Sequence, residues 1–323
     1  MLREVPALEA VGLVKNYRQR RGSPGSRSIL AVDDVTLQLE SGRTLALVGE
    51  SGSGKSTIAR LLCHLERPTA GSILLDGHAM PARIRRAQRR QVQLVFQDPF
   101  ASLNPAHTIG YHVGRSLLIH GHCQRRAELP AAVAGILDQV NLSPGKDFLG
   151  KLPHELSGGQ RQRAAIAAAL AVGPTVLLAD EPVSMLDVSI RAEILTLLRR
   201  LTTEQDLALL YITHDIASAR YFADSIVVLY KGRIVERGPA ADVVDTPSHP
   251  YTKLLVAAAP RGGAGHPEPL PQRRGLAVAA GGARCPFANR CPHAVDLCTR
   301  ERPPEVPVGD GRFAACWRQA DNP

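Results

Sequence analysis

Residues 49–56 read GESGSGKS, which fits the pattern G-x-x-x-x-G-K-[ST] of a phosphate-binding loop. The loop follows an apolar segment at 44–48, a predicted buried strand, and precedes a segment with helical spacing at 57–65. Its glycines let the backbone curve so that N–H groups face phosphate oxygens, and the helix N-terminus adds partial positive charge. We therefore expect nucleotide contacts at Gly49, Gly52, Gly54, Lys55, Ser56 and Thr57.

A second apolar run, at 176–179, ends in the carboxylates of Asp180 and Glu181. At the carboxyl end of a buried strand, Asp180 is placed to hold Mg²⁺ through water, and Ser56 of the loop to bind Mg²⁺ directly. We expect Lys55 to reach the β- and γ-phosphates, and Glu181 to orient or deprotonate the attacking water. Two acids that simply cap a strand are the alternative, which the nearby phosphate motif disfavours.

A third motif, Ser157-Gly158-Gly159-Gln160, precedes an alanine-rich helix at 161–172. Ser157 is a good N-cap, and the two glycines leave the first N–H groups of the helix accessible to an anion. Two phosphate-binding helix ends in one domain are understandable if the second serves a partner's nucleotide. The motif therefore predicts a head-to-tail dimer with ATP between the subunits, with an ordinary helix cap as the alternative.

The sequence argues against three classes of protein: membrane-spanning, secreted and nucleic-acid-binding. The longest apolar run, residues 164–172, is far shorter than the roughly 20 residues of a membrane-spanning helix. The N-terminus has no apolar core of a secretion signal, so we expect a cytoplasmic protein; if it works at a membrane, other chains must hold it there. The net charge is +9, but the densest basic stretch, 83–90, has no aromatic residue for base stacking. We expect no nucleic-acid partner; a solvated basic face or nearby anionic lipid explains the charge.

The predicted strands and helices alternate, which is typical of an α/β fold with a parallel sheet. We predict an N-terminal β subdomain with an arginine-rich loop at 18–28, and a helical insertion at about 100–172. A nucleotide-binding domain would span 5–258. A Gly/Pro-rich linker at 259–282 would lead into a small cysteine-bearing tail at 283–323.

These motifs resemble the ATP-binding cassette (ABC) family over residues 5–258, a P-loop NTPase fold. The resemblance implies that Tyr17 stacks on adenine and that Gln97 senses Mg²⁺ and the permease interface. It also implies that Asp187 belongs to the D-loop, where Met185 replaces the usual alanine, and that His214 contacts the γ-phosphate. The implied catalytic residues are Glu181, His214 and Gln97, and Ser56, Gln97 and Asp180 would hold Mg²⁺.

A narrower resemblance is to the ATPases of oligopeptide and dipeptide importers. Four stretches carry it: 96–105, 153–156, 249–252 and 284–294. It implies uptake of peptides through two separate permeases, with a second ATPase subunit, a solute-binding protein, and a peripheral position on the cytoplasmic membrane face. Nickel or oligosaccharide import is the alternative. A soluble ABC ATPase acting on DNA or ribosomes is disfavoured, because the chain shows no long heptad repeats and has one P-loop.

Four of the six cysteines, Cys285, Cys291, Cys298 and Cys316, lie in the last forty residues. In a cytoplasmic protein this crowding favours metal ligation over disulfides. The spacing is too wide for a common zinc knuckle, whereas four thiolates suit an iron–sulfur cluster. The resemblance to peptide-importer ATPases implies a [4Fe–4S] cluster; zinc and unligated thiols remain open.

Overall fold

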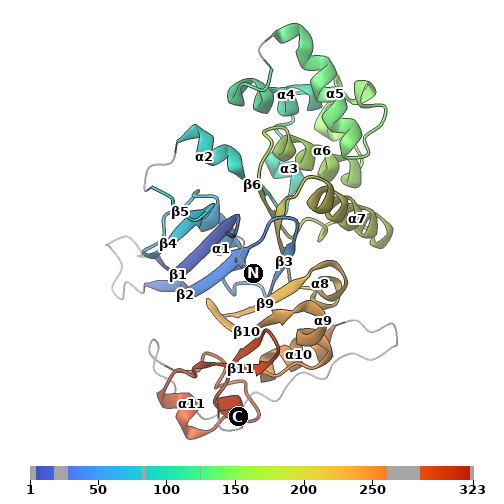
Figure 1. Cartoon of the computed structure of the whole chain (residues 1–323). Coiled ribbons are helices and arrows are strands. Elements are labelled where there is room, and N and C mark those ends of the chain that lie inside the picture. The colour runs from blue at the N-terminus through green and yellow to red at the C-terminus, as the bar shows by residue number, and fades with distance from the viewer. Residues whose placement is uncertain (1–4, 18–27, 82–84, 124, 260–283, 321–323) are drawn as a thin grey trace, which may run out of the picture.

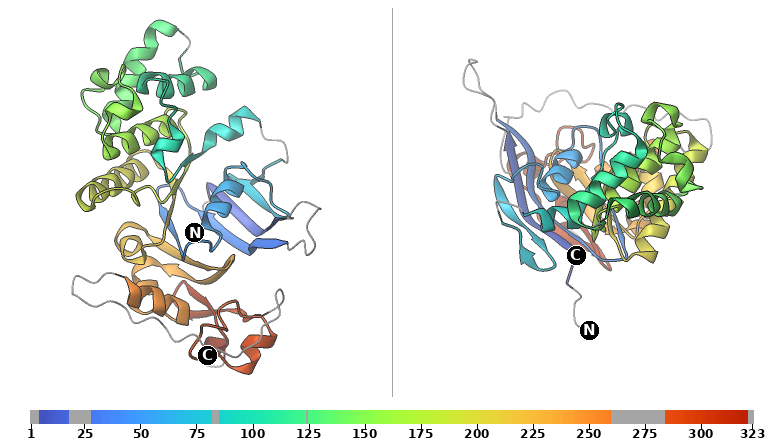
Figure 2. Two further views of the ribbon diagram at one scale, coloured as in Figure 1. Left: turned by 180° about the vertical axis from the view of Figure 1, so that it is seen from behind. Right: turned by 90° about the horizontal axis from the view of Figure 1, so that it is seen from above.

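The computed structural model describes residues 5–17, 28–81, 85–123, 125–259 and 284–320. A helical region occupies one end of the molecule, and the C-terminal tail lies at the opposite end (Figure 1). Between them stand a central sheet and, beside it, a smaller N-terminal sheet (Figure 2). Most of the expected loop at 18–28 and of the expected linker at 259–282 lies outside the described residues.

The central sheet has eight strands in the order β11-β12-β10-β9-β3-β8-β7-β6. The five strands from β9 to β6 run parallel, and β10, β12 and β11 continue the sheet in antiparallel pairs. The strands are β3 (Thr44–Val48), β6 (Val92–Val95), β7 (Val176–Asp180), β8 (Ala208–Thr213), β9 (Ser225–Tyr230), β10 (Arg233–Pro239), β11 (Glu305–Gly309) and β12 (Arg312–Ala315). The predicted α/β class with a parallel sheet is confirmed.

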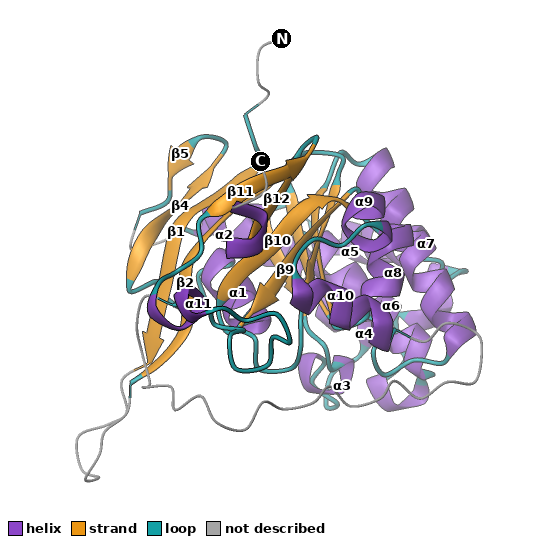
Figure 3. Ribbon diagram, turned by 90° about the horizontal axis from the view of Figure 1, so that it is seen from below, coloured by secondary structure: helices purple, strands orange, loops and turns teal. Residues whose placement is uncertain are grey.

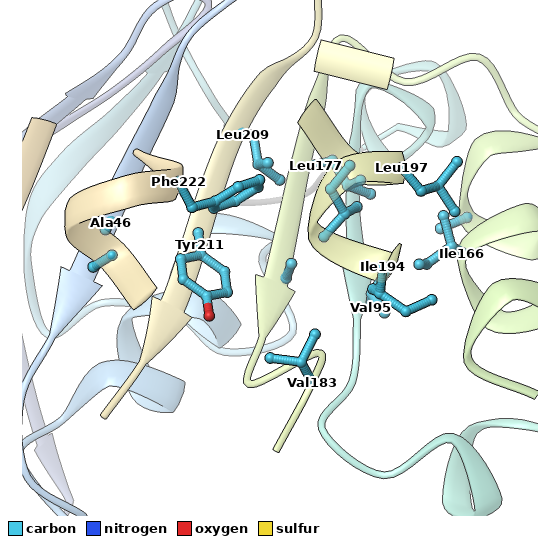
Figure 4. Packing of buried hydrophobic residues seen from close by; sticks show 14 of the residues in the cluster. Ala46, Val95, Ile166, Leu177, Val183, Ile194, Leu197, Leu209, Tyr211 and Phe222 are labelled. Carbon is cyan, nitrogen blue, oxygen red and sulfur yellow. The ribbon is translucent and has the colours of Figure 1, made fainter. Parts of the chain in front are cut away.

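The middle strands are buried on both faces, which explains their uninterrupted apolar sequences. Alternate side chains of a strand enter different cores. In β8, Leu209 and Tyr211 face the helices, whereas Leu210 and Ile212 face the smaller sheet. Figure 4 shows the helix-side core, in which the rings of Tyr211 and Phe222 meet edge to face at 4.9 Å.

The smaller sheet is antiparallel, in the order β2-β1-β4-β5. Its strands are β1 (Leu8–Tyr17), β2 (Ile29–Leu39), β4 (Ala70–Leu75) and β5 (His78–Ala79). Its buried face packs with α1 (Lys55–Leu62) on the second face of the central sheet. Helix α1 begins two residues before the predicted helix, because the glycine loop itself supplies its N-terminus.

The predicted helical segment at 100–172 contains most of the helices at the far end of the molecule. It holds α3 (Pro99–Ser102), α4 (Ile109–His120), α5 (Leu129–Gln139) and α6 (Gly158–Leu170), with short 3₁₀ turns at Arg126–Glu128, Gly145–Phe148 and Pro153–Glu155. Thr108 caps α4 by accepting a hydrogen bond from the Tyr111 N–H. On α5, Val133 and Leu137 lie four residues apart on one face of the helix, and both are buried.

The remaining helices are distributed around the central sheet (Figure 3). They are α2 (Arg86–Gln91), α7 (Val188–Glu204), α8 (Ile216–Phe222), α9 (Ala240–Asp245), α10 (Pro250–Ala258), α11 (Asp296–Arg300) and α12 (Trp317–Ala320). Of the described helices, none has both the length and the apolar character required to cross a bilayer.

The tail extends the central sheet, an integration that the sequence did not predict. Strand β12 pairs with β10, opposite Glu236 and Arg237. Glu236 is fully buried and accepts hydrogen bonds from the N–H groups of Ser248 (2.8 Å) and His249 (2.9 Å), while Arg312 of β12 lies 3.5 Å away. A tail of this size buries too little surface to fold alone, so its attachment to the main core supplies the missing burial.

Candidate active site

The glycine loop connects β3 to α1 and passes close to neighbouring backbone. A Cβ at Gly49 would lie 2.3 Å from the Leu229 carbonyl oxygen, and one at Gly54 would lie 2.4 Å from that of Ala31. Gly54 also has φ +108°, a conformation that other residues rarely adopt. Close packing against β9 and β2 therefore requires glycine at both positions and shapes the loop as the motif predicts.

Lys55 is enclosed by this loop. Only 5% of it is exposed, and its Nζ donates to the carbonyl oxygens of Gly49 (2.7 Å) and Glu50 (3.0 Å). Burial lowers the pKa of Lys55, and the carboxylates of Glu181, Asp180 and Glu50 act in the opposite direction. The ammonium group thus lies in a desolvated position where an anionic ligand would be strongly attracted.

Ser56 and Asp180 lie side by side, as expected for a Mg²⁺ site. Burial is the main cause of a raised pKa at Asp180, whereas a hydrogen bond from Ser56 lowers it. Asp180 Oδ1 is buried and has no hydrogen-bond partner among the described residues. An orphaned carboxylate oxygen beside a hydroxyl fits a small divalent cation, which prefers oxygen ligands.

Three predicted catalytic side chains meet at Glu181. Its Oε2 accepts a hydrogen bond from Gln97 Nε2 at 3.0 Å, and its Oε1 lies 3.2 Å from His214 Nδ1. Glu181 has φ +45°, which is strained for a residue with a side chain, and its N–H donates to the Ile212 carbonyl. The carboxylate lies at the edge of the sheet where the neighbouring parallel strands β6, β7 and β8 end.

Most of these groups line one open cleft with a volume of about 890 Å³, whereas Gly49 and Asp180 are not among its lining residues. The predicted residues at its wall are Gly52, Gly54, Lys55, Ser56, Thr57, Gln97, Glu181 and His214. The sequence did not predict Ile29–Ala31, Lys231 or Leu255, which also line it. Lys231 lies in the turn between β9 and β10, and this hairpin could have been detected from the sequence. Nothing in the sequence, however, placed the hairpin beside the phosphate-binding loop.

Tyr17 stands at the edge of this cleft. It pairs with Ile29, a lining residue, across β1 and β2. Its hydroxyl donates to Glu66 Oε2 at 2.5 Å, and the Lys15 ammonium lies 5.0 Å from its ring centre. Ring stacking on a nucleotide base remains a prediction.

The motif at 157–160 is separate from the cleft. Ser157 is the N-cap of α6, as predicted: its Oγ accepts from the Gln160 N–H, and Gln160 Oε1 accepts from the Ser157 N–H. A Cβ at Gly159 would lie 2.6 Å from Ile190 Cγ2 on α7, so glycine is required for this helix contact. No residue of this motif is among the described residues that line the cleft.

Asp187 is exposed at the start of α7, and it too is outside the cleft lining. Beside it, the Val188 side chain is 81% exposed and Met185 is 59% exposed. The helix start at 187 therefore presents apolar surface close to the motif at 157–160, because a Cβ at Gly158 would lie 3.4 Å from Leu186 Cδ2.

The four tail cysteines are unpaired thiols that lie close enough for Cys291, Cys298 and Cys316 to act electrostatically on Cys285. Cys285, Cys291 and Cys298 are buried, and the Cys285 N–H donates to the Cys298 carbonyl. Burial raises the pKa of Cys285 to about 11, and the charges of Cys298, Cys316 and Cys291 add to this rise. In the part of the chain that the structure describes, however, no three Cys, His, Asp or Glu form a metal-holding group. The donor set suits a metal, but the predicted ligand geometry is not found.

A glycine loop that encloses a lysine, beside an orphaned aspartate oxygen and a glutamate held by glutamine and histidine, defines a P-loop nucleotide hydrolase. Comparison with known proteins adds the family. Residues 32–184 match the family model described as ABC transporter, and residues 235–298 match the oligopeptide/dipeptide transporter C-terminal region.

Two relatives match nearly the whole chain. The di/tripeptide transport ATP-binding protein DppF of Pseudomonas aeruginosa is 42% identical, with 96% of each chain covered. The dipeptide transport ATP-binding protein DppF of Haemophilus influenzae is 38% identical, over 97% of this chain and 96% of its own. The chain therefore belongs to the ABC transporter family, as an ATP-binding and ATP-hydrolysing member.

Solved structures agree with this assignment. The cassette cbiO1 from Clostridium perfringens, part of the cbiONQ complex, superposes with a TM-score of 0.64 at 27% identity, covering 75% of this chain and 92% of its own. The cassette MJ0796, in a dimeric post-hydrolysis state with ADP and Pi, gives 0.63 at 29% identity, covering 72% and 98%. The predicted P-loop NTPase fold is confirmed.

The position of Glu181 leads to a testable expectation. Glu181→Gln keeps the shape of the side chain but removes its basicity, so ATP turnover should fall on the order of 10²–10⁴-fold while ATP binding persists. Phosphate release and nucleotide affinity measure the two effects separately. Glu204→Gln, an exposed change on α7, is the matched control. Turnover at the wild-type rate in Glu181→Gln would exclude Glu181 as the general base.

Proposed function

We propose that this chain drives a peptide importer, supplying ATP hydrolysis to permeases on other chains. The observation that carries the proposal is the pairing of a complete hydrolytic site with a C-terminal region of oligopeptide/dipeptide transporter type. Two relatives that align over almost their entire length are named for dipeptide or di/tripeptide transport. The structure supports the same conclusion, because this C-terminal region is built into the sheet that carries the active site.

The roles of the site residues follow from their positions. The loop N–H groups and Lys55 would bind the phosphates, and Ser56 and Asp180, with Gln97 beside them, would hold Mg²⁺. Bound Mg²⁺ supplies positive charge that offsets the charge on the phosphate oxygens. Glu181 would take a proton from the water that attacks the γ-phosphorus, as the bond to the bridging oxygen breaks. Gln97 and His214, which contact its two carboxylate oxygens, would orient Glu181.

The chain would work as a head-to-tail dimer, with itself or with a related ATPase. In support, Ser157 and Gly158 stand at an exposed helix start that lies outside the chain's own cleft, near the exposed Asp187. An anion site in this position has no phosphate of its own chain to bind. It would meet the γ-phosphate held by a partner and complete the partner's site.

The dimer can be tested with Ser157→Arg, whose long side chain would obstruct the proposed anion site. We expect hydrolysis to fall at least tenfold, while the isolated subunit still binds ATP. In a Glu181→Gln background, ATP should trap a dimer detectable by light scattering, and adding Ser157→Arg should prevent the trapping. Loss of ATP binding by the isolated Ser157→Arg subunit would mean that this motif serves its own nucleotide.

The proposed partners are two membrane-spanning permeases and, indirectly, a solute-binding protein. The chain would lie peripherally on the cytoplasmic face of the membrane. Exposed Phe96 supports contact with a permease, because it offers apolar surface beside Gln97 of the catalytic cleft. Tyr111 on α4, in the helical region, is exposed as well. Conformational changes that ATP causes at Gln97 would then be transmitted to that surface.

Reconstitution tests the substrate class. The complete transporter, with its binding protein, should hydrolyse ATP several-fold faster when di- or oligopeptides are added. Nickel ions and oligosaccharides are the matched comparison, since related importers take them up. If nickel ions or oligosaccharides stimulate hydrolysis and peptides do not, peptide import is wrong and the stimulating solute is the substrate. The ATPase assignment would still hold.

We further propose that the four tail thiols bind a [4Fe–4S] cluster. Support comes from their number, their unpaired state and their mutual proximity, which suit a cluster with four thiolate ligands. Binding would require Cys285, Cys291, Cys298 and Cys316 to converge further than they do here. Its role would be structural, since none of the described residues near the thiols is placed for catalysis.

Anaerobic purification tests the cluster. We expect about four iron and four sulfide ions per chain and a brown chromophore. Cys298→Ser should lower the iron content and the melting temperature together. A colourless protein with about one zinc per chain, or with no metal, would contradict the cluster.

A further inference from the structure

The tail touches the phosphate-binding loop directly. The Arg290 guanidinium donates two hydrogen bonds to the carboxylate of Glu50, the second residue of the loop: Nη1 to Oε2 at 2.8 Å and Nη2 to Oε1 at 2.9 Å. This two-bond geometry is the strongest and most directional form of an arginine–carboxylate pair. It joins positions 240 residues apart in the sequence.

A second contact holds the backbone of the same loop residue. The Glu50 N–H donates to the Tyr251 hydroxyl at 2.9 Å, and Tyr251 is fully buried on α10. Its ring packs against Tyr230 at 4.6 Å and against Phe287 of the tail at 5.5 Å. The Arg290 guanidinium lies 5.8 Å from the ring centres of Tyr230 and Phe287, which restricts its position.

The charge of Glu50 matters because of its location. Glu50 lines the cleft beside the loop, and its carboxylate acts electrostatically on Lys55, the residue placed to meet the phosphates. An unpaired carboxylate there would repel a nucleotide carrying several negative charges. Arg290 offsets that charge and points Glu50 toward the tail. Both side chains are more than one-third exposed, so solvent screening keeps the effect moderate.

We propose that Arg290 is a positioning residue for nucleotide binding: it holds Glu50 away from the phosphates and offsets its charge, so that the tail sets the nucleotide affinity of the loop. The inference rests on the proposed binding of the phosphates at residues 49–56. It adds to that assignment a residue outside the cleft, contributed by the oligopeptide-type tail.

The test measures the affinity of the full-length chain for Mg²⁺·ADP, which is not hydrolysed, by calorimetry. Arg290→Gln should raise Kd about two- to fivefold, and the effect should shrink at high salt. The KM for ATP should rise by a similar factor, with kcat much less affected. Arg302→Gln is the matched control, because Arg302 is a tail arginine of similar exposure paired with Asp34, away from the cleft.

The decisive comparison is between Arg290→Gln and the double variant Glu50→Gln/Arg290→Gln. Both lack the arginine, so any damage to the fold of the tail is common to them. The double variant should recover most of the lost affinity, because the repelling charge is gone. If it binds no better than Arg290→Gln, or if Arg290→Gln leaves Kd unchanged, the inference is wrong.

Lys55→Ala separates this failure from a failure of the phosphate assignment. If Lys55→Ala abolishes binding while Arg290→Gln has no effect, the loop binds the phosphates without help from the tail, and Arg290 has no positioning role. If Lys55→Ala binds ADP normally, the phosphate assignment fails, and the role of Arg290 fails with it.

Discussion

The parallel pairing of β3, β8, β7 and β6 is the constraint on which the active site depends. Residue Val48 pairs with Thr213, Asp180 with Ile212, and Val95 with Ala179. All four strands therefore end at one edge of the sheet. Each contributes its next residues to that edge: the phosphate loop after β3, Gln97 after β6, Glu181 after β7 and His214 after β8. A one-residue slip in strand register would turn every side chain of that strand to the opposite face of the sheet. Burial on both faces fixes the register, and the register fixes the positions of the site residues.

A second constraint acts on the loop itself. Its backbone passes within contact distance of β9 and β2, and Gly49 and Gly54 allow the approach. Glu50 also forms hydrogen bonds with Tyr251 and Arg290. Because the tail adds strands to the same sheet, the loop is supported by the tail as well as by the nucleotide domain. This arrangement gives a physical reason for fusing an oligopeptide-type tail to an ATPase: tail and phosphate loop share one packed interface.

The hydrolytic cleft and the helix start at Ser157 are separate parts of the molecule. The cleft contains the groups for hydrolysis, whereas Ser157 caps a helix whose exposed start is elsewhere. Gly159 is explained by its contact with Ile190 even without a ligand.

The sequence alone determined the parts whose residues are neighbours along the chain. The loop at 49–56, the strand end at Asp180, the N-cap at Ser157 and the buried strands could be recognised because local motifs and apolar periodicity carry their physics. Strands β10, β11 and β12 were missed because their apolar runs are short or interrupted, and pairing with distant strands stabilises them. Strand β9 was missed although residues 226–230 form an unbroken apolar run. Only the tertiary structure decided that Arg290 meets Glu50, that Glu236 anchors the tail, and that Gln97 and His214 both meet Glu181. These contacts depend on packing between segments far apart in the chain, and no local pattern encodes which surfaces will be buried together.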